Sequence, residues 1–285
     1  MFKKLTYGSS ETIRETTFDF RLYKNLYLPE HKTSIDKAFL EWFIGFFEGD
    51  GSFIVSRPKV GSHRLFFTLT QNEIQVLHRL RTKLGFGKVQ KHGKYFRFVV
   101  TKRGDVDRLI HLFNGNLILK KTNERFKALL AARNELHTEK VYYKGPCQSI
   151  QFLQSGWLSG FIDAEGCFYL ERKETSKSFH VKCVMLIDQK DELEILEQIQ
   201  NELESAGFIE CRKNSTNYRY RVSSILIFEK HVFPYLNKYL LRTIKKRVSL
   251  ARFKKMVNYR ISRKDLPWEG KVLERIKRLF KKLEK

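Results

Sequence analysis

The sequence lacks a hydrophobic run long enough to cross a membrane, and its few cysteines lack the spacing of a metal site. Spanning a bilayer takes about 20 consecutive apolar residues, whereas the longest apolar stretches here are broken by acids. The four cysteines, at positions 147, 167, 183 and 211, form no C-x-x-C pair, and no histidine pair has zinc-ligand spacing. We therefore expect a soluble protein with free thiols in a reducing compartment.

The motifs of several enzyme classes are also missing. The chain has no nucleophilic serine or cysteine motif, no phosphate-binding P-loop and no dinucleotide-binding glycine pattern. Residues 1–37 contain no signal-peptide core, and their acids argue against a transit peptide. We expect this segment to form an arm or a loosely packed extension.

Acidic residues are scarce relative to basic ones. The chain has 31 Asp and Glu against 55 Lys and Arg, which gives a formal charge of +24. Such a charge attracts polyanions. The basic residues are interleaved with 24 Phe and 12 Tyr, which supply apolar material for a core. The composition therefore predicts a folded nucleic-acid-binding protein rather than a disordered basic tail.

One motif occurs twice in the chain. Residues 42–53 read WFIGFFEGDGSF and residues 157–168 read WLSGFIDAEGCF, with Trp, Gly, Phe, acid, small residue, acid, Gly and Phe in register. A repeat at domain spacing indicates two copies of one domain. The chain is therefore expected to have twofold pseudosymmetry.

Strand and helix signals follow each motif in the same order, which predicts an α+β chain of two pseudosymmetric αββαββα repeats. The first copy predicts strands at 52–57, 64–71, 87–90 and 95–101, and helices at 72–84, 103–114 and 120–136. The second predicts strands at 167–172, 179–188, 208–212 and 218–223, and helices at 191–206, 225–236 and 243–257. The predicted divisions are an arm (1–37), a first repeat (38–138), a linker (139–151), a second repeat (152–257) and a basic helical tail (258–285).

Small residues mark one face of each motif helix. Glycine inside a helix costs about 1 kcal/mol relative to alanine, so its presence in these apolar helices needs a compensating contact. Gly45 and Gly49 are four residues apart, as are Gly160 and Ala164, so each pair lies on one face. We expect these four residues to let the two helices pack closely against each other.

The acids of each motif occupy the last helical turn, where the helix dipole disfavours a carboxylate. Helices that run side by side would bring the acids of both together, and repulsion would add to the cost. A divalent cation such as Mg²⁺, which prefers oxygen ligands and also binds phosphate, removes this conflict. A polyanionic substrate and a carboxylate-held metal together indicate phosphodiester hydrolysis.

Each motif has two acids, and only one of them can face a given metal. Residues two apart on a helix point about 200° away from each other. The later acids, Asp50 and Glu165, are favoured because Gly51 and Gly166 follow them and leave room for a phosphate. The earlier acids could bond backbone at the helix junction. The alternative is a buried structural helix pair whose acids cap nearby amides.

On these residues, the two motifs resemble those of the single-chain LAGLIDADG homing endonucleases, and the resemblance covers residues 38–257. It implies a central interface of the two motif helices and two four-stranded antiparallel sheets that lie as a saddle in the DNA major groove. It also implies metal binding by the last motif acids, and our metal set is Asp50, Glu165, Gly49 and Ala164. Mg²⁺ is the expected ion; Mn²⁺ should substitute for it, and Ca²⁺ should support binding without cleavage.

The resemblance also implies further active-site groups. A glutamine at the end of the second strand is matched by Gln71 and, in the second repeat, by Gln189 within Asp188-Gln189, where an insertion leaves the register open. A basic residue near the start of the last helix is matched by Lys120, and in the second repeat by Arg242 or Lys245. Our catalytic set is Asp50, Glu165, Gln71, Gln189, Lys120 and Lys245.

Alternate residues of each strand should face the DNA, since a two-stranded ribbon fits the major groove. The first repeat contributes Ser52, Ile54, Ser56, Arg64, Thr68, Thr70, Lys88, Gln90 and Lys94. The second contributes Tyr169, Glu171, Lys173, His180, Lys182, Arg212, Asn217, Arg219 and Arg221. These side chains can bond both base edges and phosphates.

The resulting hypothesis is a monomeric, metal-dependent endonuclease that cuts double-stranded DNA at a long, loosely palindromic site and leaves short 3′ overhangs. Family resemblance favours an organelle, either mitochondrion or chloroplast, and no protein partner or membrane is implied. Two alternatives remain, an intron RNA-splicing maturase on the same fold and a non-catalytic DNA-binding regulator. Retention of both Asp50 and Glu165 speaks for cleavage.

Overall fold

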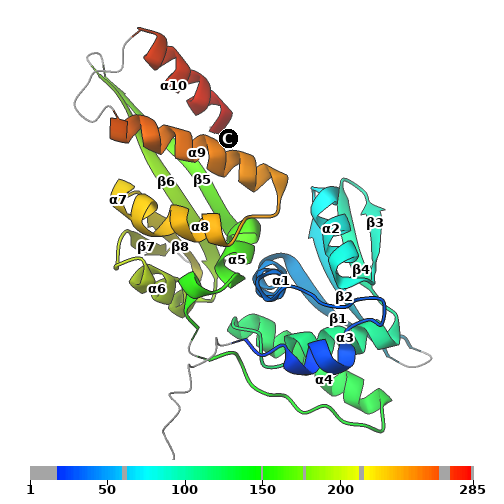
Figure 1. Ribbon diagram of the computed structural model, residues 1–285. Coiled ribbons are helices and arrows are strands. Elements are labelled where there is room, and N and C mark those ends of the chain that lie inside the picture. The colour runs from blue at the N-terminus through cyan, green and yellow to red at the C-terminus, as the bar shows by residue number, and fades with distance from the viewer. Residues whose placement is uncertain are drawn as a thin grey trace, which may run out of the picture.

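The computed structural model describes residues 18–59, 63–148, 150–175, 178–211, 215–262 and 270–283, of which 172–175 and 178–180 by their backbone alone. Two lobes lie on either side of a central helix pair (Figure 1). Each lobe is built on a four-stranded antiparallel sheet. The structure therefore confirms the predicted α+β chain of two related repeats.

The first repeat follows the predicted order closely. Its sheet has the order β1-β2-β4-β3. Its elements are α1 (Lys37–Asp50), β1 (Gly51–Ser56), β2 (Arg64–Gln71), α2 (Ile74–Leu84), β3 (Lys88–His92), β4 (Tyr95–Val100), α3 (Arg103–Phe113) and α4 (Lys120–Leu136).

The second repeat has the same topology, with the sheet order β5-β6-β8-β7. Its strands are β5 (Gly166–Thr175), β6 (Ser178–Lys190), β7 (Phe208–Cys211) and β8 (Asn217–Val222). Its helical elements are η2 (Phe152–Gln154), α5 (Trp157–Glu165), α6 (Leu193–Glu202), α7 (Ile225–Ile227), the π-helix η3 (Phe228–Val232), α8 (Phe233–Lys238) and α9 (Ile244–Ser262).

Two elements of the second repeat differ from the prediction. The β5–β6 hairpin extends to Thr175 and Ser178 because backbone pairing continues through polar residues that carry no hydrophobic signal. The helix expected at 225–236 runs without a break from α7 through η3 to α8, but its middle part, Phe228–Val232, has π-helical bonding. Pro234 lies in the first turn of α8, and because a proline has no amide hydrogen it cannot donate the regular α-helical bond there.

Each sheet has one apolar and one polar face. In the first repeat Phe53, Phe67, Leu69 and Phe98 belong to the helix-covered face, and the last three are buried. Their strand neighbours point to the opposite face, because successive side chains alternate. An antiparallel sheet with one solvated face suits a binding surface.

The motif helices α1 and α5 pack at a distance that only small residues allow. A methyl group at Gly45 would lie 2.0 Å from the carbonyl oxygen of Trp157, and one at Gly160 would lie 1.9 Å from that of Trp42. One at Gly49 would lie 2.4 Å from the Ala164 Cβ. The predicted role of these small residues is therefore supported by direct backbone contact.

The described part of the N-terminal segment, residues 18–36, is packed rather than loose. Its π-helix η1 (Tyr23–Tyr27) lies against α3, and Phe18, Phe20 and Tyr23 are buried. The prediction of a loosely packed extension is therefore wrong for these residues. Three buried aromatic side chains supply enough apolar contact to hold the segment.

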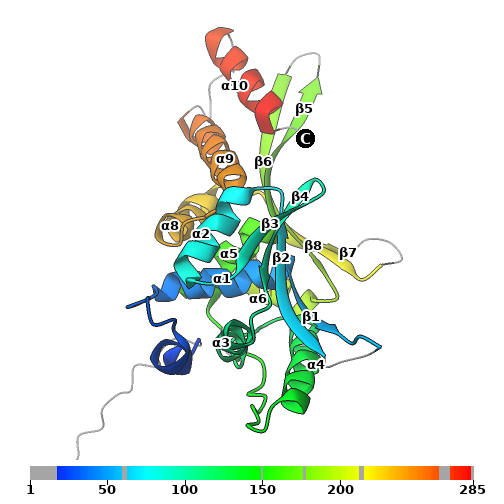
Figure 2. The same ribbon diagram turned by 90° about the vertical axis from the view of Figure 1, so that its right-hand side faces the viewer.

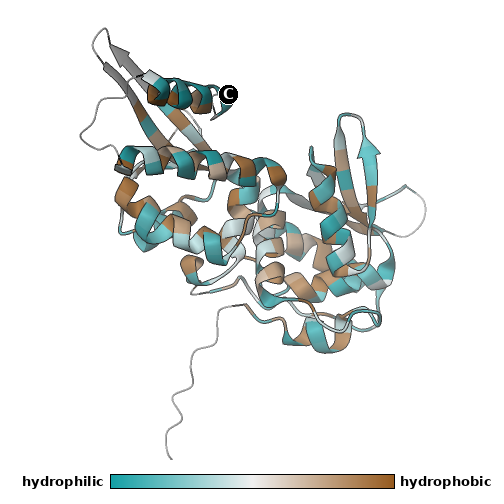
Figure 3. Cartoon of the chain, turned by 45° about the horizontal axis from the view of Figure 1, so that its top comes forward, coloured by the Kyte–Doolittle hydropathy of each residue, from teal (hydrophilic) through white to brown (hydrophobic). Residues whose placement is uncertain are grey.

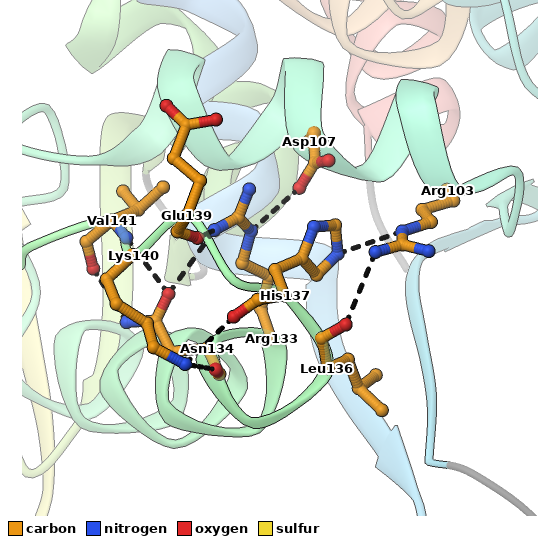
Figure 4. Close-up of polar contacts among 9 residues, drawn as sticks. All are labelled: Arg103, Asp107, Arg133, Asn134, Leu136, His137, Glu139, Lys140 and Val141. Atoms are coloured by element: carbon orange, nitrogen blue, oxygen red, sulfur yellow. Dashed lines mark hydrogen bonds and ion pairs between the residues drawn. The ribbon is translucent and has the colours of Figure 1, made fainter.

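The start of the linker is fixed to the end of α4 (Figure 4). Arg133 donates to Asp107 Oδ1 at 3.0 Å and to the carbonyl oxygen of Glu139 at 2.5 Å. The side-chain amide of Asn134 exchanges two bonds with the backbone of Val141, at 2.8 and 2.9 Å. The linker therefore leaves the first repeat along a defined path.

The basic tail ends in α10 (Gly270–Leu283), which lies beside α9 and the outer part of β5 (Figure 2). Ile276 and Phe280 are buried, and hydrophobic and hydrophilic residues share the helix (Figure 3). The tail helix thus packs on the body. Among the described residues, no helix is long and apolar enough to span a membrane.

Candidate active site and DNA-facing surface

The two motif helices exchange a tryptophan-to-acid contact. The Trp42 indole donates to Asp163 Oδ2 at 2.8 Å, and the Trp157 indole donates to Glu48 Oε2 at 2.7 Å. All four side chains are buried. Each repeat therefore satisfies a buried acid with a donor from the other repeat.

The earlier motif acids also hold the backbone that leads into the last long helices. Glu48 Oε1 accepts from the amides of Ile118 and Leu119 at 2.9 and 2.8 Å. Burial raises the pKa of Glu48 to about 8, although these bonds lower it. The earlier acid of the first motif is thus committed to the helix junction, as expected.

Asp163 does the same in the second repeat. It accepts from the amide of Arg242 at 2.6 Å, and from the amide and hydroxyl of Thr243 at 3.3 and 2.6 Å. Burial again raises the pKa of the carboxyl. Both earlier acids therefore accept hydrogen bonds from backbone amides, and the later acids are the ones left to face the substrate.

Asp50 and Glu165 end the two motif helices close to each other. The Gln71 amide donates to Asp50 Oδ2 at 2.5 Å. Burial raises the pKa of Asp50 to about 6. Burial, followed by the negative charge of Asp50, raises the pKa of Glu165 to about 7. Two partly buried carboxylates that repel each other form a site that gains from a bound cation.

The lysines that act on these acids lie one position later than predicted. The charge of Lys246 lowers the pKa of both Asp50 and Glu165, and that of Lys121 lowers the pKa of Glu165. Lys246 also donates to the Gly166 carbonyl oxygen. Lys120 instead pairs with Glu194 at 2.9 Å and is largely exposed. One position turns a helical side chain by about 100°.

Lys245 and Arg242, the two second-repeat candidates, are placed differently from Lys246. Lys245 is exposed. The Arg242 guanidinium lies 5.1 Å from the Phe39 ring centre and 5.4 Å from that of Trp42. It therefore packs at the helix interface through its side chain while its amide bonds Asp163.

Strand pairing resolves the register of the second glutamine. Gly51 pairs with Leu69, and Gly166 pairs with Ile187. Gln71 and Gln189 are each two residues further along, so they occupy equivalent positions at the ends of β2 and β6. Asp188 lies on the opposite face, and its charge contributes to the raised pKa of Glu165.

The donor set at the site is composed of oxygen. No group of three His, Cys, Asp or Glu that could hold a metal occurs among the described residues. The convergent pair Asp50 and Glu165, with Gly49 and Ala164 in mutual contact beside it, suits a hard cation that is completed by water or phosphate oxygens. The residues present therefore fit a divalent metal such as Mg²⁺.

The polar face of the first sheet contains the predicted DNA-facing positions. Ser52 pairs with Thr68, Ile54 with Phe66 and Ser56 with Arg64, which places all six on one face. The same face continues through Lys88, Thr70 and Gln90, and Lys94 lies in the β3–β4 turn. The prediction missed Arg97, which lies between Thr70 and Gln90 on this face, although its place between Phe96 and Phe98 is an alternating signal.

In the second sheet several predicted DNA-facing residues form polar contacts on the sheet itself, either with one another or with Asp188. Arg219 forms two bonds with Asp188, at 2.6 and 2.8 Å. Arg221 donates to Tyr169 at 2.8 Å and also pairs with Glu171.

Lys182 and Asn217 occupy the same face, and Lys173 and His180 are placed by their backbone pairing alone. Lys182 lies opposite Glu171, Lys173 opposite His180, and Asn217 opposite Lys190. Arg212 lies outside the described residues. Asp188 and Glu210, which the prediction missed, flank Arg219 on this face.

The sequence matches the family described as LAGLIDADG endonuclease over residues 43–132 and 158–257. It is 32% identical over 216 residues to a protein of Neurospora crassa named probable intron-encoded endonuclease 4, covering 72% of this chain and 37% of the relative. It is 29% identical over 219 residues to Schizosaccharomyces pombe probable intron-encoded endonuclease Cox1-I1b, covering 66% of this chain and 56% of the relative. The chain thus spans less than two thirds of either relative.

Solved structures show the same fold. The meganuclease I-CpaMI bound to uncleaved DNA superimposes with a TM-score of 0.72 at 17% identity, covering 88% of this chain and 100% of that one. I-SmaMI bound to an uncleaved DNA target with calcium ions gives 0.72 at 17% identity, covering 86% and 99%. Because the family match covers both repeats, this chain belongs to the LAGLIDADG endonuclease family.

Proposed function

We propose that the protein is a site-specific endonuclease that cuts both strands of a long, loosely palindromic DNA and leaves short 3′ overhangs. The observation that carries this proposal is the convergence of Asp50 and Glu165, one from each repeat, where the motif helices pass into the first strands of the two sheets. Each sheet offers a polar face to one half of the duplex, so one chain serves both half-sites.

Asp50 and Glu165 would hold the divalent metal, for which we propose Mg²⁺, with Gly49 and Ala164 beside them. When bound, the metal supplies neutralisation of phosphate charge and a lower pKa for the attacking water. Mn²⁺ should substitute, because it accepts the same oxygen donors. Ca²⁺ should support DNA binding without cleavage.

The chain's own side chains have three tasks around this pair of acids. Gln71 orients Asp50 through the hydrogen bond that its side-chain amide donates to the carboxylate. Lys246 and Lys121 favour the ionised form of the acids and provide positive charge for the phosphate. Gln189 occupies the position in the second repeat that Gln71 occupies in the first. The two halves of the site therefore carry different groups, which suits unequal cleavage of the two strands.

We further propose that the protein acts as a monomer in the mitochondrion. Relatives named for cox1 introns support an organellar role. A second candidate function is intron splicing, because one relative, 25% identical over 177 residues, is named intron-encoded RNA maturase bI4 of Saccharomyces cerevisiae. Asp50 and Glu165 serve no purpose in RNA binding alone, which favours cleavage as the primary activity.

The test is selection of cleaved sites from a randomised double-stranded DNA library with Mg²⁺ present. We expect one long site to be enriched, with cuts on both strands. Binding of that site should weaken steeply as salt rises, because lysine and arginine contacts release counterions. Recovery of no cleaved site, or a flat salt response, would contradict the proposal.

A further inference from the structure

The two long helices α4 and α9 begin beside the paired acids, and each needs partners for its first backbone amides. The first four amides of a helix have no acceptor inside it. Glu48 and Asp163 satisfy only the residues that precede the two helices, namely Ile118 and Leu119 before α4, and Arg242 and Thr243 before α9. The amides at the start of the helices proper must find other acceptors.

At α9, which belongs to the second repeat, that acceptor comes from the first repeat. Glu73 directly precedes α2. Both of its carboxylate oxygens lie 2.8 Å from the amide of Ile244, and Oε2 lies 3.2 Å from the amide of Lys245. A carboxylate here also complements the positive end of the helix dipole.

At α4, which belongs to the first repeat, the acceptor comes from the second. Glu192 directly precedes α6, in the same place that Glu73 has before α2. Its Oε1 accepts from the amide of Lys121 at 2.9 Å, and its side chain is buried. The contacts are therefore reciprocal. The start of each helix is held by two carboxylates, one from its own repeat and one from the other.

The first turns that these glutamates hold carry the lysines of the site. Lys121 is the second residue of α4 and Lys246 the third residue of α9. We propose that Glu73 and Glu192 are reciprocal positioning residues, through which each repeat fixes the helix that brings the other repeat's lysine to Asp50 and Glu165. The proposal rests on the proposed function for its catalytic consequence, but the capping contact can be measured without cleavage.

The first measurement is amide hydrogen exchange of the full-length protein without metal or DNA. Glu73→Ala should speed exchange of the Ile244 and Lys245 amides in the opposite repeat by roughly tenfold or more, while the Lys121 amide stays protected. Glu192→Ala should do the reverse. Glu194→Ala is the matched control, because it removes an exposed ion pair between the same repeats without touching these amides. Unchanged exchange across the repeats would overturn the capping role.

The second measurement is single-turnover cleavage of the selected DNA site at saturating protein. Glu73→Ala should slow cleavage between about ten- and a hundredfold, because small misplacement of a catalytic group has this effect. Glu73→Gln, which keeps an acceptor oxygen, should recover part of the loss. Glu194→Ala should cleave at the normal rate.

A double-mutant cycle separates positioning from general destabilisation. The effects of Glu73→Ala and Lys246→Met should be far from additive, whereas Glu73→Ala and Lys121→Met should add. Glu192→Ala should couple to Lys121→Met instead. Additive effects in every pair would reject the positioning role. If the unsubstituted protein cuts no DNA, the proposed function fails, and the exchange measurement alone decides the capping contacts.

Discussion

The two sheets differ in one cross-strand row of their polar faces, which lies next to Gln71 in the first sheet and next to Gln189 in the second. In the first sheet Arg97 lies between Thr70 and Gln90, which are neutral. In the second sheet the equivalent Arg219 lies between Asp188 and Glu210, and it forms two bonds with Asp188. The same row is therefore positive in one repeat and negative in the other.

This difference indicates two modes of DNA contact on one scaffold. An arginine between neutral neighbours is available to phosphates and to bases. An arginine held by a carboxylate has lost much of its rotamer freedom and presents its guanidinium in a fixed direction. The acids beside it also repel the DNA backbone. We expect the first sheet to contribute more to affinity and the second more to discrimination between sequences.

The largest expected effect concerns the pair of acids to which each repeat contributes one, Asp50 and Glu165. Asp50→Asn and Glu165→Gln should each lower the rate of double-strand cleavage by roughly a thousandfold or more, because metal binding needs both charges. DNA affinity in Ca²⁺ should change little. The measurements are cleavage on a supercoiled plasmid carrying the selected site, and a binding titration. Normal double-strand cutting by the double variant would contradict the assignment.

A large side chain at the helix interface should destabilise the protein equally whether it is placed in the first or the second repeat. Gly45→Leu and Gly160→Leu each force a side chain into a backbone carbonyl that lies within about 2 Å of the first added carbon. Each should lower the free energy of unfolding by more than about 3 kcal/mol. Urea unfolding followed by circular dichroism measures it. A variant of normal stability would show that the helices can separate without cost.

Substitution of Lys246 should slow cleavage more than substitution of Lys121. Lys246 acts on both acids, whereas Lys121 acts on Glu165 alone. Lys246→Met should slow single-turnover cleavage about a hundredfold, and Lys121→Met about tenfold. Lys120→Met is the control, since its ammonium pairs with Glu194. If Lys120→Met slowed cleavage as much as Lys121→Met, the assignment of the active-site lysine to position 121 would be contradicted.

The polar rows of the sheets can be compared directly. Arg97→Ala should weaken binding to all sequences and reduce its salt dependence. Arg219→Ala should relax base preference in one half-site, by about 1–3 kcal/mol at the affected position. Asp188→Asn should tighten non-specific binding while it loosens that preference. Binding to a library of single-base variants distinguishes these outcomes.

The smallest effect is a pH dependence of stability in the metal-free protein. The pKa values of Asp50 and Glu165 are raised to about 6 and about 7, so the folded protein holds these protons more tightly than the unfolded chain. The stability gained from them is complete below the ordinary carboxyl range and is lost as pH rises through about 7. Asp50→Asn and Glu165→Gln should therefore raise the melting temperature in EDTA at pH 8, and less so at pH 5.

The repeat, the strand order and the position of the later motif acids at the helix ends could be predicted from the sequence because each has a local signal. Glycine spacing reports helix packing, and alternation reports the strand faces. The lysine positions could not be predicted to the residue. They depend on where α4 and α9 begin, and that depends on carboxylates from distant parts of the chain.

The ion pairs of the second sheet had no signal in the sequence either. Arg219 and Asp188 are brought opposite each other by the β6–β8 register, and the longer β5–β6 hairpin hid that register. Glu73 and the amide of Ile244 are 171 residues apart. Contacts of this kind follow from tertiary arrangement and not from pattern.

The exchange of tryptophan and acid between the motif helices bears on how the chain arose. Each repeat contains one tryptophan and one acid of this exchange, namely Trp42 and Glu48 in the first repeat and Trp157 and Asp163 in the second. Two identical copies of either repeat could therefore satisfy all the same groups as a homodimer. The arrangement is what duplication and fusion of a symmetric dimer would leave behind. Once joined, the copies were free to diverge, and the order of Glu and Asp is now reversed between the two motifs.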